Sequence, residues 1–470
     1  KVFNLIKWNT IWNISRYILS FVFSIVLAQY ITPQEYGLTG MISIFTIIAA
    51  LLVNSGFSTS IIRDKSATDE DYSSIFYFNI FLSIALYLIL FFSADGIASF
   101  YNEPELVILL PLISIPLILN SFNLVQNALL IKSLNLKRQA IINLTALSIS
   151  IVVGCVFVLN GFGIYSIVAH LIAQSIIMII LHWTYSDWRP TSSFDLAKIK
   201  SHWKFSSNIL FTSLFNQIML NIDNLIIGKA YSTHELGIVM RAKNSKNIPE
   251  NITSGTVSTV SFSVLSNIND QKELFIKKFY GFLKLSLIVS ALCSVLLFVL
   301  SEEFILILYG GVWADSIDFL KIYALLILPN VIGVLYSQTI LALGNSKLYF
   351  FISVTKRMII GISLIFAFYY SIKQFLVILV VLSWIAFTIE SIIIFKELKT
   401  ELYRCLKTLL ILTSISSIII LINQLIFNSI DFELNVVISA LIKFSVSTLL
   451  FIIGVLIFWK KNELIEILND

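Results

Sequence analysis

Charged side chains inside long apolar segments are the residues of this sequence whose chemistry demands a partner. The stretch 234–265 carries Lys243, Lys246 and Glu250 at spacings of three and four residues. Residues at these spacings share one face of a helix, and Lys246 falls near the middle of the stretch. A charge at mid-bilayer costs about 2.5–3.5 kcal/mol or more, so it must face a partner or a water-filled cavity. The spacing predicts either a wet, cationic surface or internal ion pairs that fix helix packing.

Other charged and polar side chains extend this candidate site. Besides Lys243 and Lys246, the candidates for a substrate-binding cavity are Arg16, Arg241, Asn247 and Arg357. Arg and Lys supply the donors that phosphate oxygens require, so we expect an anionic substrate. The acidic candidates for ion pairing or ion coupling are Asp223, Glu250 and Glu390. Lys443, in the last apolar stretch, is expected to be structural.

The composition requires that membrane helices position these residues. Of the 470 residues, 58% are hydrophobic and only 13% are charged, against about 25% charged in soluble domains. A soluble protein of this size could not bury so much apolar surface. The apolar runs are continuous and about twenty residues long, the length of a transmembrane helix, whereas the strands of a membrane barrel alternate over about ten. The sequence predicts an all-α integral membrane protein and excludes a soluble enzyme or a disordered chain.

About fourteen stretches are long and apolar enough to span a membrane. The eighth, 234–265, is the weakest, because it is polar and contains Pro249, and it would fail a hydropathy threshold taken alone. With that stretch included and the N-terminus in the cytoplasm, almost all Lys and Arg residues between spans fall in cytoplasmic segments. The external loops then hold only Lys229 and Lys373. This distribution follows the positive-inside rule and predicts that both termini are cytoplasmic.

An internal repeat relates two halves of the chain. The segment 31–38 (ITPQEYGL) matches 231–238 (YSTHELGI), and 54–56 (NSG) matches 253–255 (TSG). Two later correspondences pair Pro116 with Pro329 and Gln126 with Gln338. Spans one to six therefore correspond to spans seven to twelve, and an even number of spans gives both halves the same orientation. We expect two six-helix bundles related by a pseudo-twofold axis along the membrane normal, plus a C-terminal helix pair, as in a transporter that alternates between inward-open and outward-open states.

The predicted organisation has four parts. They are a first lobe at 1–185, a cytoplasmic linker at 186–204, a second lobe at 205–396 and the final helix pair at 397–470. The three cysteines and four histidines lack the spacing of a metal site or a disulfide framework, and no nucleotide-binding motif is present. We therefore expect no metal, no cofactor and no nucleic-acid partner. No predicted loop is long enough to hold an active site, which disfavours an enzyme.

Several segments match the pattern of one family of transporters. They are 31–37 (ITPQEYG), 54–58 (NSGFS), 61–63 (IIR), 71–73 (DYS), 76–79 (FYFN), the linker after 187–190 (DWRP), 221–228 (NIDNLIIG), 235–237 (ELG) and 241–243 (RAK). In these segments the chain resembles the Wzx-type polysaccharide flippases, a branch of the MOP superfamily, and it is most similar to the teichuronic-acid and colanic-acid exporters. The resemblance covers roughly residues 5–400. It departs from the family after Gly237, where Ile238, Val239 and Met240 replace the usual aromatic residues.

The resemblance implies a flippase of the bacterial cytoplasmic (inner) membrane. Its substrate would be the undecaprenyl-pyrophosphate-linked oligosaccharide repeat unit, moved from the inner to the outer leaflet by alternating access for O-antigen or exopolysaccharide biosynthesis. The resemblance also implies coupling to protons, sodium or the membrane potential, and it allows contacts with the polymerase and export machinery of the same pathway. Two transporters of the same superfamily remain alternatives: a MATE-type ion-coupled exporter of small molecules and a lipid II flippase. A membrane glycan polymerase is the least favoured alternative.

Overall fold

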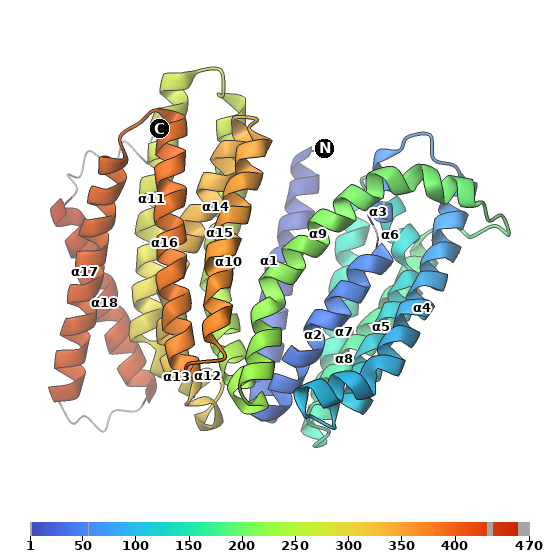
Figure 1. The fold of residues 1–470 in the computed structure, drawn as a ribbon, viewed down its shortest axis with the longest axis horizontal. Coiled ribbons are helices and arrows are strands. Elements are labelled where there is room, and N and C mark those ends of the chain that lie inside the picture. The colour runs from blue at the N-terminus through green and yellow to red at the C-terminus, as the bar shows by residue number, and fades with distance from the viewer. Residues whose placement is uncertain (1, 55, 430–435, 459–470) are drawn as a thin grey trace. The chain divides into compact units, whose positions relative to one another are not determined.

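The computed structural model describes residues 2–54, 56–429 and 436–458. Within these ranges every regular element is a helix, which confirms the predicted all-α fold. The helices pack into two compact units, Lys1–Gly237 (unit 1) and Ile238–Asp470 (unit 2). Unit 1 holds α1 (Val2–Ala28), α2 (Pro33–Asn54), α3 (Phe57–Arg63), α4 (Asp69–Tyr101), α5 (Leu106–Ser121), α6 (Leu124–Lys132), α7 (Leu136–Leu159), α8 (Tyr165–Tyr185) and α9 (Leu196–Ala230) (Figure 1).

Helix α10 (Thr233–Asn267) begins in unit 1 and continues into unit 2. The remaining helices of unit 2 are α11 (Lys272–Val299), α12 (Ser301–Leu308), the short 3₁₀ helix η1 (Gly311–Trp313), α13 (Ser316–Ala324), α14 (Ile327–Ala342), α15 (Ser346–Phe366), α16 (Ile372–Leu398), α17 (Leu402–Ser429) and α18 (Val436–Phe458). In this unit α11 packs against α14 and α17, and α15 packs against α16. The centre of the unit is aromatic, with Phe279, Tyr336, Phe387 and Phe395 buried together.

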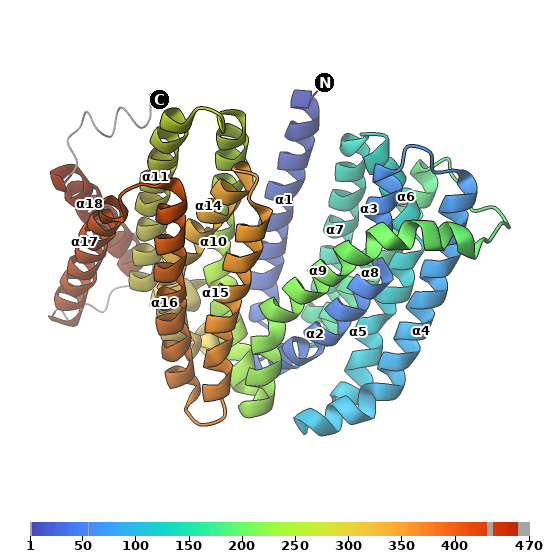
Figure 2. The same cartoon turned by 45° about the horizontal axis from the view of Figure 1, so that its top comes forward.

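Helix α9 belongs to unit 1, and this placement differs from the predicted linker. It packs against α2 and α4, and both views show it running along α2 and arching over the unit (Figures 1 and 2). Because α9 begins at Leu196, the second half of the predicted linker 186–204 is helical. Ile199 of this helix joins the buried cluster around Phe57 and Phe76. The division by packing therefore falls at Gly237, after α9, rather than within the linker.

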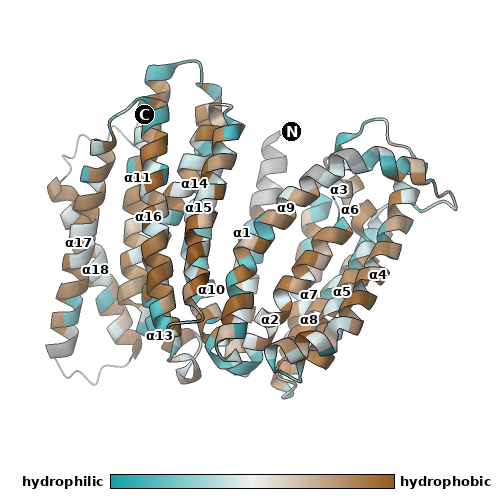
Figure 3. Cartoon of the chain, viewed as in Figure 1, coloured by the Kyte–Doolittle hydropathy of each residue, from teal (hydrophilic) through white to brown (hydrophobic). Residues whose placement is uncertain are grey.

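The number of candidate spans is slightly lower than predicted. Among the described residues, 12 helices are long and apolar enough to cross a membrane, and counting the pair α5 and α6, bent by 48°, as one span gives 13. The helix missing from the predicted fourteen is α10, whose polar residues keep it below the threshold, as the sequence indicated. Elsewhere hydrophobic residues cover the middles of the helices, and hydrophilic residues gather at their ends (Figure 3). Phe92 is 76% exposed and Leu410 is 67% exposed, which suits contact with lipid, and the chain is a multi-pass membrane protein.

The two copies of the predicted repeat begin with the same local structure. At the start of α2, the backbone N–H of Thr32 donates to Oε2 of Glu35 at 2.9 Å, and the backbone N–H of Glu35 donates to the Thr32 hydroxyl at 3.3 Å. At the start of α10, Ser232 and Glu235 make the same pair of bonds at 3.0 and 3.1 Å. Both are capping boxes, in which two otherwise unpaired amides at a helix start are satisfied reciprocally.

A second duplicated turn escaped the sequence comparison. The turn before α7 places Leu134 at φ 58°, and the turn before α15 places Gly344 at φ 75°. In each turn the next residue caps the following helix. Oδ1 of Asn135 accepts from the backbone N–H of Arg138, and Oδ1 of Asn345 accepts from the backbone N–H of Leu348. Comparison of the sequences missed this match, because the left-handed position is occupied by Gly in one copy and by Leu in the other.

Two glycines of the repeat lie at a close crossing between the first turns of α2 and α10, within unit 1. A Cβ atom built on Gly37 would overlap the carbonyl oxygen of Thr233, and one built on Gly237 would overlap the carbonyl oxygen of Pro33. Gly37 corresponds to Gly237 in the repeat, and Pro33 corresponds to Thr233. Each contact is therefore the counterpart of the other in the second half of the repeat, as expected for contacts related by a twofold axis.

The repeat is not preserved everywhere. Helix α2 ends at Asn54, and Gly56 adopts φ 69° before α3 begins. The matching residues 253–255 lie inside the uninterrupted helix α10. Residue 55, part of the sequence match, lies outside the described residues.

Candidate functional site

Helix α10 supplies the most polar surface among the long helices of the described chain. Its 35 residues include Pro249, which lacks the amide hydrogen that would bond the preceding turn. The hydroxyl of Thr253 donates to the carbonyl of Pro249 at 2.8 Å. In unit 2 the helix is fixed by its packing: Ser316 donates to the carbonyl of Ile238 at 3.2 Å, and Ser245 donates to the hydroxyl of Tyr309 at 3.3 Å.

Lys246 is joined to Glu250 one turn further along α10. Its Nζ lies 2.8 Å from Oε2 of Glu250, and the two side chains are 7% and 16% exposed. The same carboxylate oxygen accepts from Nδ2 of Asn330 on α14 at 3.1 Å. Of the two outcomes that the spacing allowed for Lys246, this structure contains the ion pair. The pair is net neutral, and the side-chain amide of α14 holds the carboxylate end of it.

The other candidates on α10 differ in burial. Lys243 and Asn247 are half-buried. Arg241 is 1% exposed, and its guanidinium carbon lies 4.5 and 4.2 Å from the ring centroids of Tyr309 and Trp313. Stacking against two aromatic faces stabilises a cation that is removed from water. Arg241 thus lies in an aromatic packing site, and its predicted contact with substrate remains a prediction.

A second ion pair lies between α15 and α16. Nζ of Lys356 is 3.4 Å from Oε2 of Glu390, which is 3% exposed. Gly333 of α14 leaves room for the pair, because a Cβ there would lie 2.6 Å from the Lys356 nitrogen and 3.2 Å from the carboxylate. Glu390 was predicted as an ion-pairing or coupling residue, and the structure gives it this partner. The neighbouring candidate Arg357 is half-buried on α15.

The two remaining candidates lie in unit 1. Arg16 is exposed on α1, with its guanidinium carbon 5.9 Å from the ring of Trp12 and 5.0 Å from the ring of Tyr17. Asp223 is half-buried on α9, where its Oδ1 accepts from the backbone N–H of Asn224 at 3.0 Å. Neither geometry tests the role that the sequence predicted.

Lys443 forms an ion pair that the sequence did not foresee. On α18 it contacts the carboxylate of Glu303 on α12, with the two side chains 14% and 4% exposed. Ser439, one turn earlier on α18, also donates to this carboxylate at 2.8 Å. The pair attaches the C-terminal helices to the rest of unit 2. No sequence signal linked two residues so far apart in the chain.

A polar cluster between α3, α4 and α9 was also missed. His202 lies 2.6 Å from the hydroxyl of Ser60 through Nδ1 and 3.7 Å from Asp71 through Nε2. Lys198 lies 3.5 Å from the same Asp71 carboxylate. The cluster joins the start of α9 to the start of α4. Its only signal in the sequence was the motif 71–73 (DYS), which resembles the flippase family.

The loop beside this cluster carries Asp64. Hydrogen bonds from the hydroxyl and the backbone of Ser66 are the main reason that the pKa of Asp64 lies below its ordinary value, and the nearby His202 and Lys132 lower it further. Lys132 of α6 donates to the Asp64 carbonyl at 2.6 Å.

No group of three or more His, Cys, Asp or Glu side chains within the described ranges could hold a metal ion.

This arrangement of paired charges in apolar helices, on an all-α fold, is typical of transporters rather than of enzymes. A family model described as "Polysaccharide biosynthesis protein" matches residues 26–318, more than half of the chain. The chain belongs to this family. The family match and the relatives described next confirm the resemblance to Wzx-type flippases of the MOP superfamily, so the chain is a membrane transporter of polysaccharide biosynthesis.

Individual relatives agree with the family. The teichuronic acid biosynthesis protein TuaB of Bacillus subtilis (strain 168) is 25% identical over 365 residues, which cover 76% of this chain and 74% of TuaB. The lipopolysaccharide biosynthesis protein WzxC of Escherichia coli (strain K12) is 22% identical over 70% of this chain and 67% of WzxC. The succinoglycan biosynthesis transport protein ExoT of Rhizobium meliloti (strain 1021) is 22% identical, and the match spans 65% of ExoT.

Solved structures identify the fold. A structure titled lipid II flippase MurJ, inward closed conformation, matches with a TM-score of 0.76 and 18% identity, covering 96% of this chain and 99% of MurJ. An inward-facing multidrug resistance MATE family transporter of the MOP superfamily matches with a TM-score of 0.62 and 14% identity, covering 81% of this chain and 94% of that one. At these identities the likeness shows a shared fold, and substrate choice must be argued from the residues.

Proposed function

We propose that this polysaccharide biosynthesis protein moves undecaprenyl-pyrophosphate-linked oligosaccharide repeat units from the inner to the outer leaflet of the bacterial cytoplasmic membrane. The observation that carries the proposal is the Lys246–Glu250 pair of α10, whose carboxylate is held by Asn330 of α14. An ionisable residue inside a membrane span is a candidate functional group, because a charge at that depth is costly to keep.

The pair supplies a cation that can change partners. Lys246 donates to a carboxylate in this structure, and a pyrophosphate is a competing acceptor of the same type with more charge. When Glu250 takes up a proton or turns away, the ammonium becomes available to the phosphate oxygens. Lys243, half-buried on the same helix, adds a second positive charge, and Asn247 adds an amide for a sugar hydroxyl or a phosphate oxygen. In this scheme Arg16 and Arg357 are additional cationic contacts, and Asp223 and Glu390 are coupling or pairing groups.

Transport is proposed to follow alternating access by the two repeat halves. The duplicated capping boxes and turns support halves of common origin and equal orientation. The proposed lobes, 1–185 and 205–396, divide the chain by its repeat, whereas the packing division falls at Gly237. Both termini are proposed to lie in the cytoplasm. Moving one negative charge outward across an inside-negative membrane gains about 2.3 kcal/mol per 100 mV. A pyrophosphate headgroup can therefore draw on the membrane potential in addition to any coupling ion. The polymerase of the same pathway would receive the flipped unit.

The test is surface polysaccharide display in a host whose own flippase gene is deleted and replaced by variants of this chain. We expect the double variant Lys243→Gln/Lys246→Gln to lose display while the protein remains in the membrane. Lys373→Gln is the matched control, because Lys373 pairs with Asp318 on an exposed surface, with the two side chains 61% and 56% exposed. It should display polysaccharide like the unmodified protein.

A charge exchange separates a transport role from a packing role. Lys246→Glu/Glu250→Lys keeps an ion pair on α10 but reverses its direction, and Asn330 can turn its amide to accept instead of donate. If the pair only stabilises packing, the exchanged protein should recover display. We expect it to be stable but inactive, because the ammonium is displaced by one helical turn. Full display by this variant or by the double glutamine variant would contradict the proposal.

A lipid II flippase is the second candidate, because the fold shared with MurJ over 96% of the chain is compatible with either substrate. The same cells distinguish the two functions. Survival of cells depleted of their lipid II flippase when this chain is expressed would favour the second candidate. Restored surface polysaccharide without such survival would favour the first.

A further inference from the structure

A pocket of about 440 Å³ lies at one end of unit 1, between the turn that joins α6 to α7 and the end of α8. Its volume falls in the range of small-molecule sites, about 300–1,000 Å³. None of the residues that the sequence predicted as a site lines it. The pocket belongs to the end of the molecule that the charge distribution predicts to face the cytoplasm, where a lipid-linked saccharide would arrive.

Polar groups without partners lie in the wall of this pocket. Gln126 of α6 is 0% exposed, and both its Nε2 and its Oε1 have no hydrogen-bond partner within the described residues. The indole N–H of Trp188, another wall residue, is likewise buried without an acceptor. Nearly all buried polar groups in native proteins have a partner. The Gln126 amide can both donate and accept, and the Trp188 indole N–H is a further donor in the same lining, so these groups suit a ligand that both donates and accepts.

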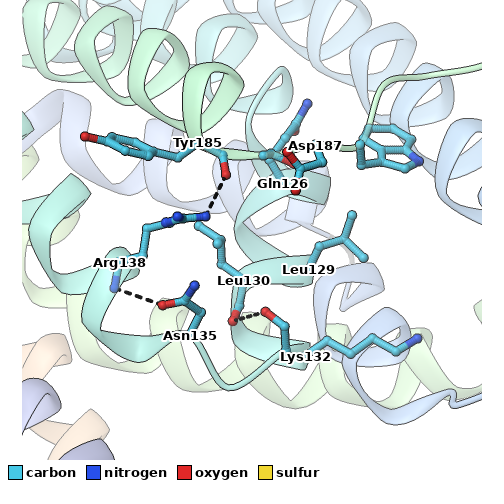
Figure 4. Close-up of a pocket in the computed structure, with 11 residues that line it drawn as sticks. Gln126, Leu129, Leu130, Lys132, Asn135, Arg138, Tyr185 and Asp187 are labelled. Carbon is cyan, nitrogen blue, oxygen red and sulfur yellow. Dashed lines mark hydrogen bonds between the residues drawn. The ribbon is translucent and has the colours of Figure 1, made fainter.

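The pocket lining holds two cations, Lys132 and Arg138, and one anion, Asp187. Figure 4 shows the guanidinium of Arg138 reaching under Tyr185, whose carbonyl accepts from Nη1 at 3.2 Å. The side chain of Lys132 extends away in the same view, and its ammonium donates to the Asp64 carbonyl and the Tyr72 hydroxyl. Asp187 adds one negative charge to the lining. One cation and one anion at the rim do not select for a phosphate.

We propose that this pocket binds a neutral saccharide ring. Adjacent hydroxyls of a sugar present a donor and an acceptor together, which match the two ends of the Gln126 amide. The carboxylate of Asp187 accepts from hydroxyls, and the guanidinium of Arg138 and the indole N–H of Trp188 donate to them. The inference rests on the proposed function, since it assigns to unit 1 a contact for the sugar part of the lipid-linked substrate. The pyrophosphate part stays with α10.

The experiment measures sugar binding directly on the full-length protein in lipid nanodiscs. Saturation-transfer difference NMR is recorded with glucose, galactose, N-acetylglucosamine and glucuronic acid as probes, and inorganic phosphate is added as a competitor. We expect at least one neutral sugar to give a signal that empty nanodiscs do not give. Gln126→Leu should reduce this signal tenfold or more, and Asp187→Asn, an exposed change that leaves the fold alone, should weaken it. Added phosphate should leave it unchanged.

Asn79→Leu is the matched control. Asn79 on α4 is also 0% exposed with both amide atoms unpartnered, but it does not line the pocket. Its variant should keep the sugar signal. Absence of any neutral-sugar signal, a signal that survives Gln126→Leu, or displacement by phosphate would each overturn the proposal.

The two proposals fail separately. Lys243→Gln/Lys246→Gln should bind sugar normally while display is lost, because the altered lysines lie outside the pocket. Display restored by the wild-type chain without any sugar signal would overturn the pocket and leave the flippase in place. Sugar binding by a chain that restores no display would overturn the proposed flippase function and leave the sugar pocket in place.

Discussion

Alanine at Gly37 or Gly237 tests the crossing between the first turns of α2 and α10. A Cβ at Gly37 would overlap the carbonyl oxygen of Thr233 and lie 2.9 Å from its carbonyl carbon. A Cβ at Gly237 would overlap the carbonyl oxygen of Pro33 and lie 2.6 Å from that carbonyl carbon. These are backbone atoms, which cannot rotate away as the end of a side chain can. Each substitution therefore forces the two helices apart.

The expected loss follows from two opposing effects. Inserting a methyl group into a packed contact costs about 1–3 kcal/mol, whereas replacing a helical glycine by alanine gains about 0.5–1 kcal/mol. At the middle of both ranges the net loss is about 1.3 kcal/mol for each variant, which lowers the unfolding midpoint by roughly 2–5 °C in a unit of this size. One separation of the helices relieves both overlaps, so the double variant Gly37→Ala/Gly237→Ala should lose less than the sum of the two.

Thermal unfolding of the detergent-solubilised protein, followed by tryptophan fluorescence, measures these shifts. Gly96→Ala on α4 and Gly255→Ala on α10 are matched controls, because a Cβ at either position would meet no atom within 4 Å. Both controls should unfold at the wild-type temperature or slightly above it. The reasoning would be refuted if Gly37→Ala and Gly237→Ala behaved like these controls, or if their effects simply added.

Two further predictions concern paired groups. Lys443→Met should lower the unfolding midpoint strongly, because removing one partner of a buried ion pair costs about 3–5 kcal/mol. The double variant Lys443→Met/Glu303→Gln should regain most of the loss, and an unchanged midpoint in the single variant would contradict the buried pair. Acid should loosen the turn at Asp64. Hydrogen bonds from Ser66 hold the native pKa of Asp64 below its ordinary value of 3.8. The stabilisation of the folded state by the Asp64 carboxylate is therefore complete above pH 3.8 and is lost as the pH falls through the native pKa. Hydrogen exchange of residues 64–68, corrected for intrinsic rates, should rise with acid in the wild type and show no such step in Asp64→Ala; a flat wild-type profile would contradict it.

The sequence predicted the features that depend on local order along the chain. Composition and run length gave the all-α membrane fold, and the polar stretch 234–265 was identified as the exceptional helix. The spacing of Lys246 and Glu250 left two possibilities for Lys246, a water-filled surface or an ion pair. The repeat was detected where its residues match, at 31–38 and 231–238, and missed at Leu134 and Gly344, where only the backbone conformation is shared.

Other features depended on which helices pack together. Asn330 holds Glu250, and Glu303 meets Lys443, although α10 and α14, and α12 and α18, are far apart in the chain. The same applies to the pocket around Gln126, whose wall comes from α6, the turn before α7 and the end of α8. Side-chain periodicity fixes the face of a helix on which a residue lies, but it carries no information about the helix opposite.

The sequence by itself therefore determined the class of fold, the presence of charges within the membrane and their spacing within each helix, because hydrophobic run length and the helical period are properties of a single segment. The tertiary structure decided whether each charge meets a carboxylate, an aromatic ring or an open surface. That choice depends on contacts between distant segments, and in an apolar medium the balance between pairing and desolvation changes with every neighbouring group.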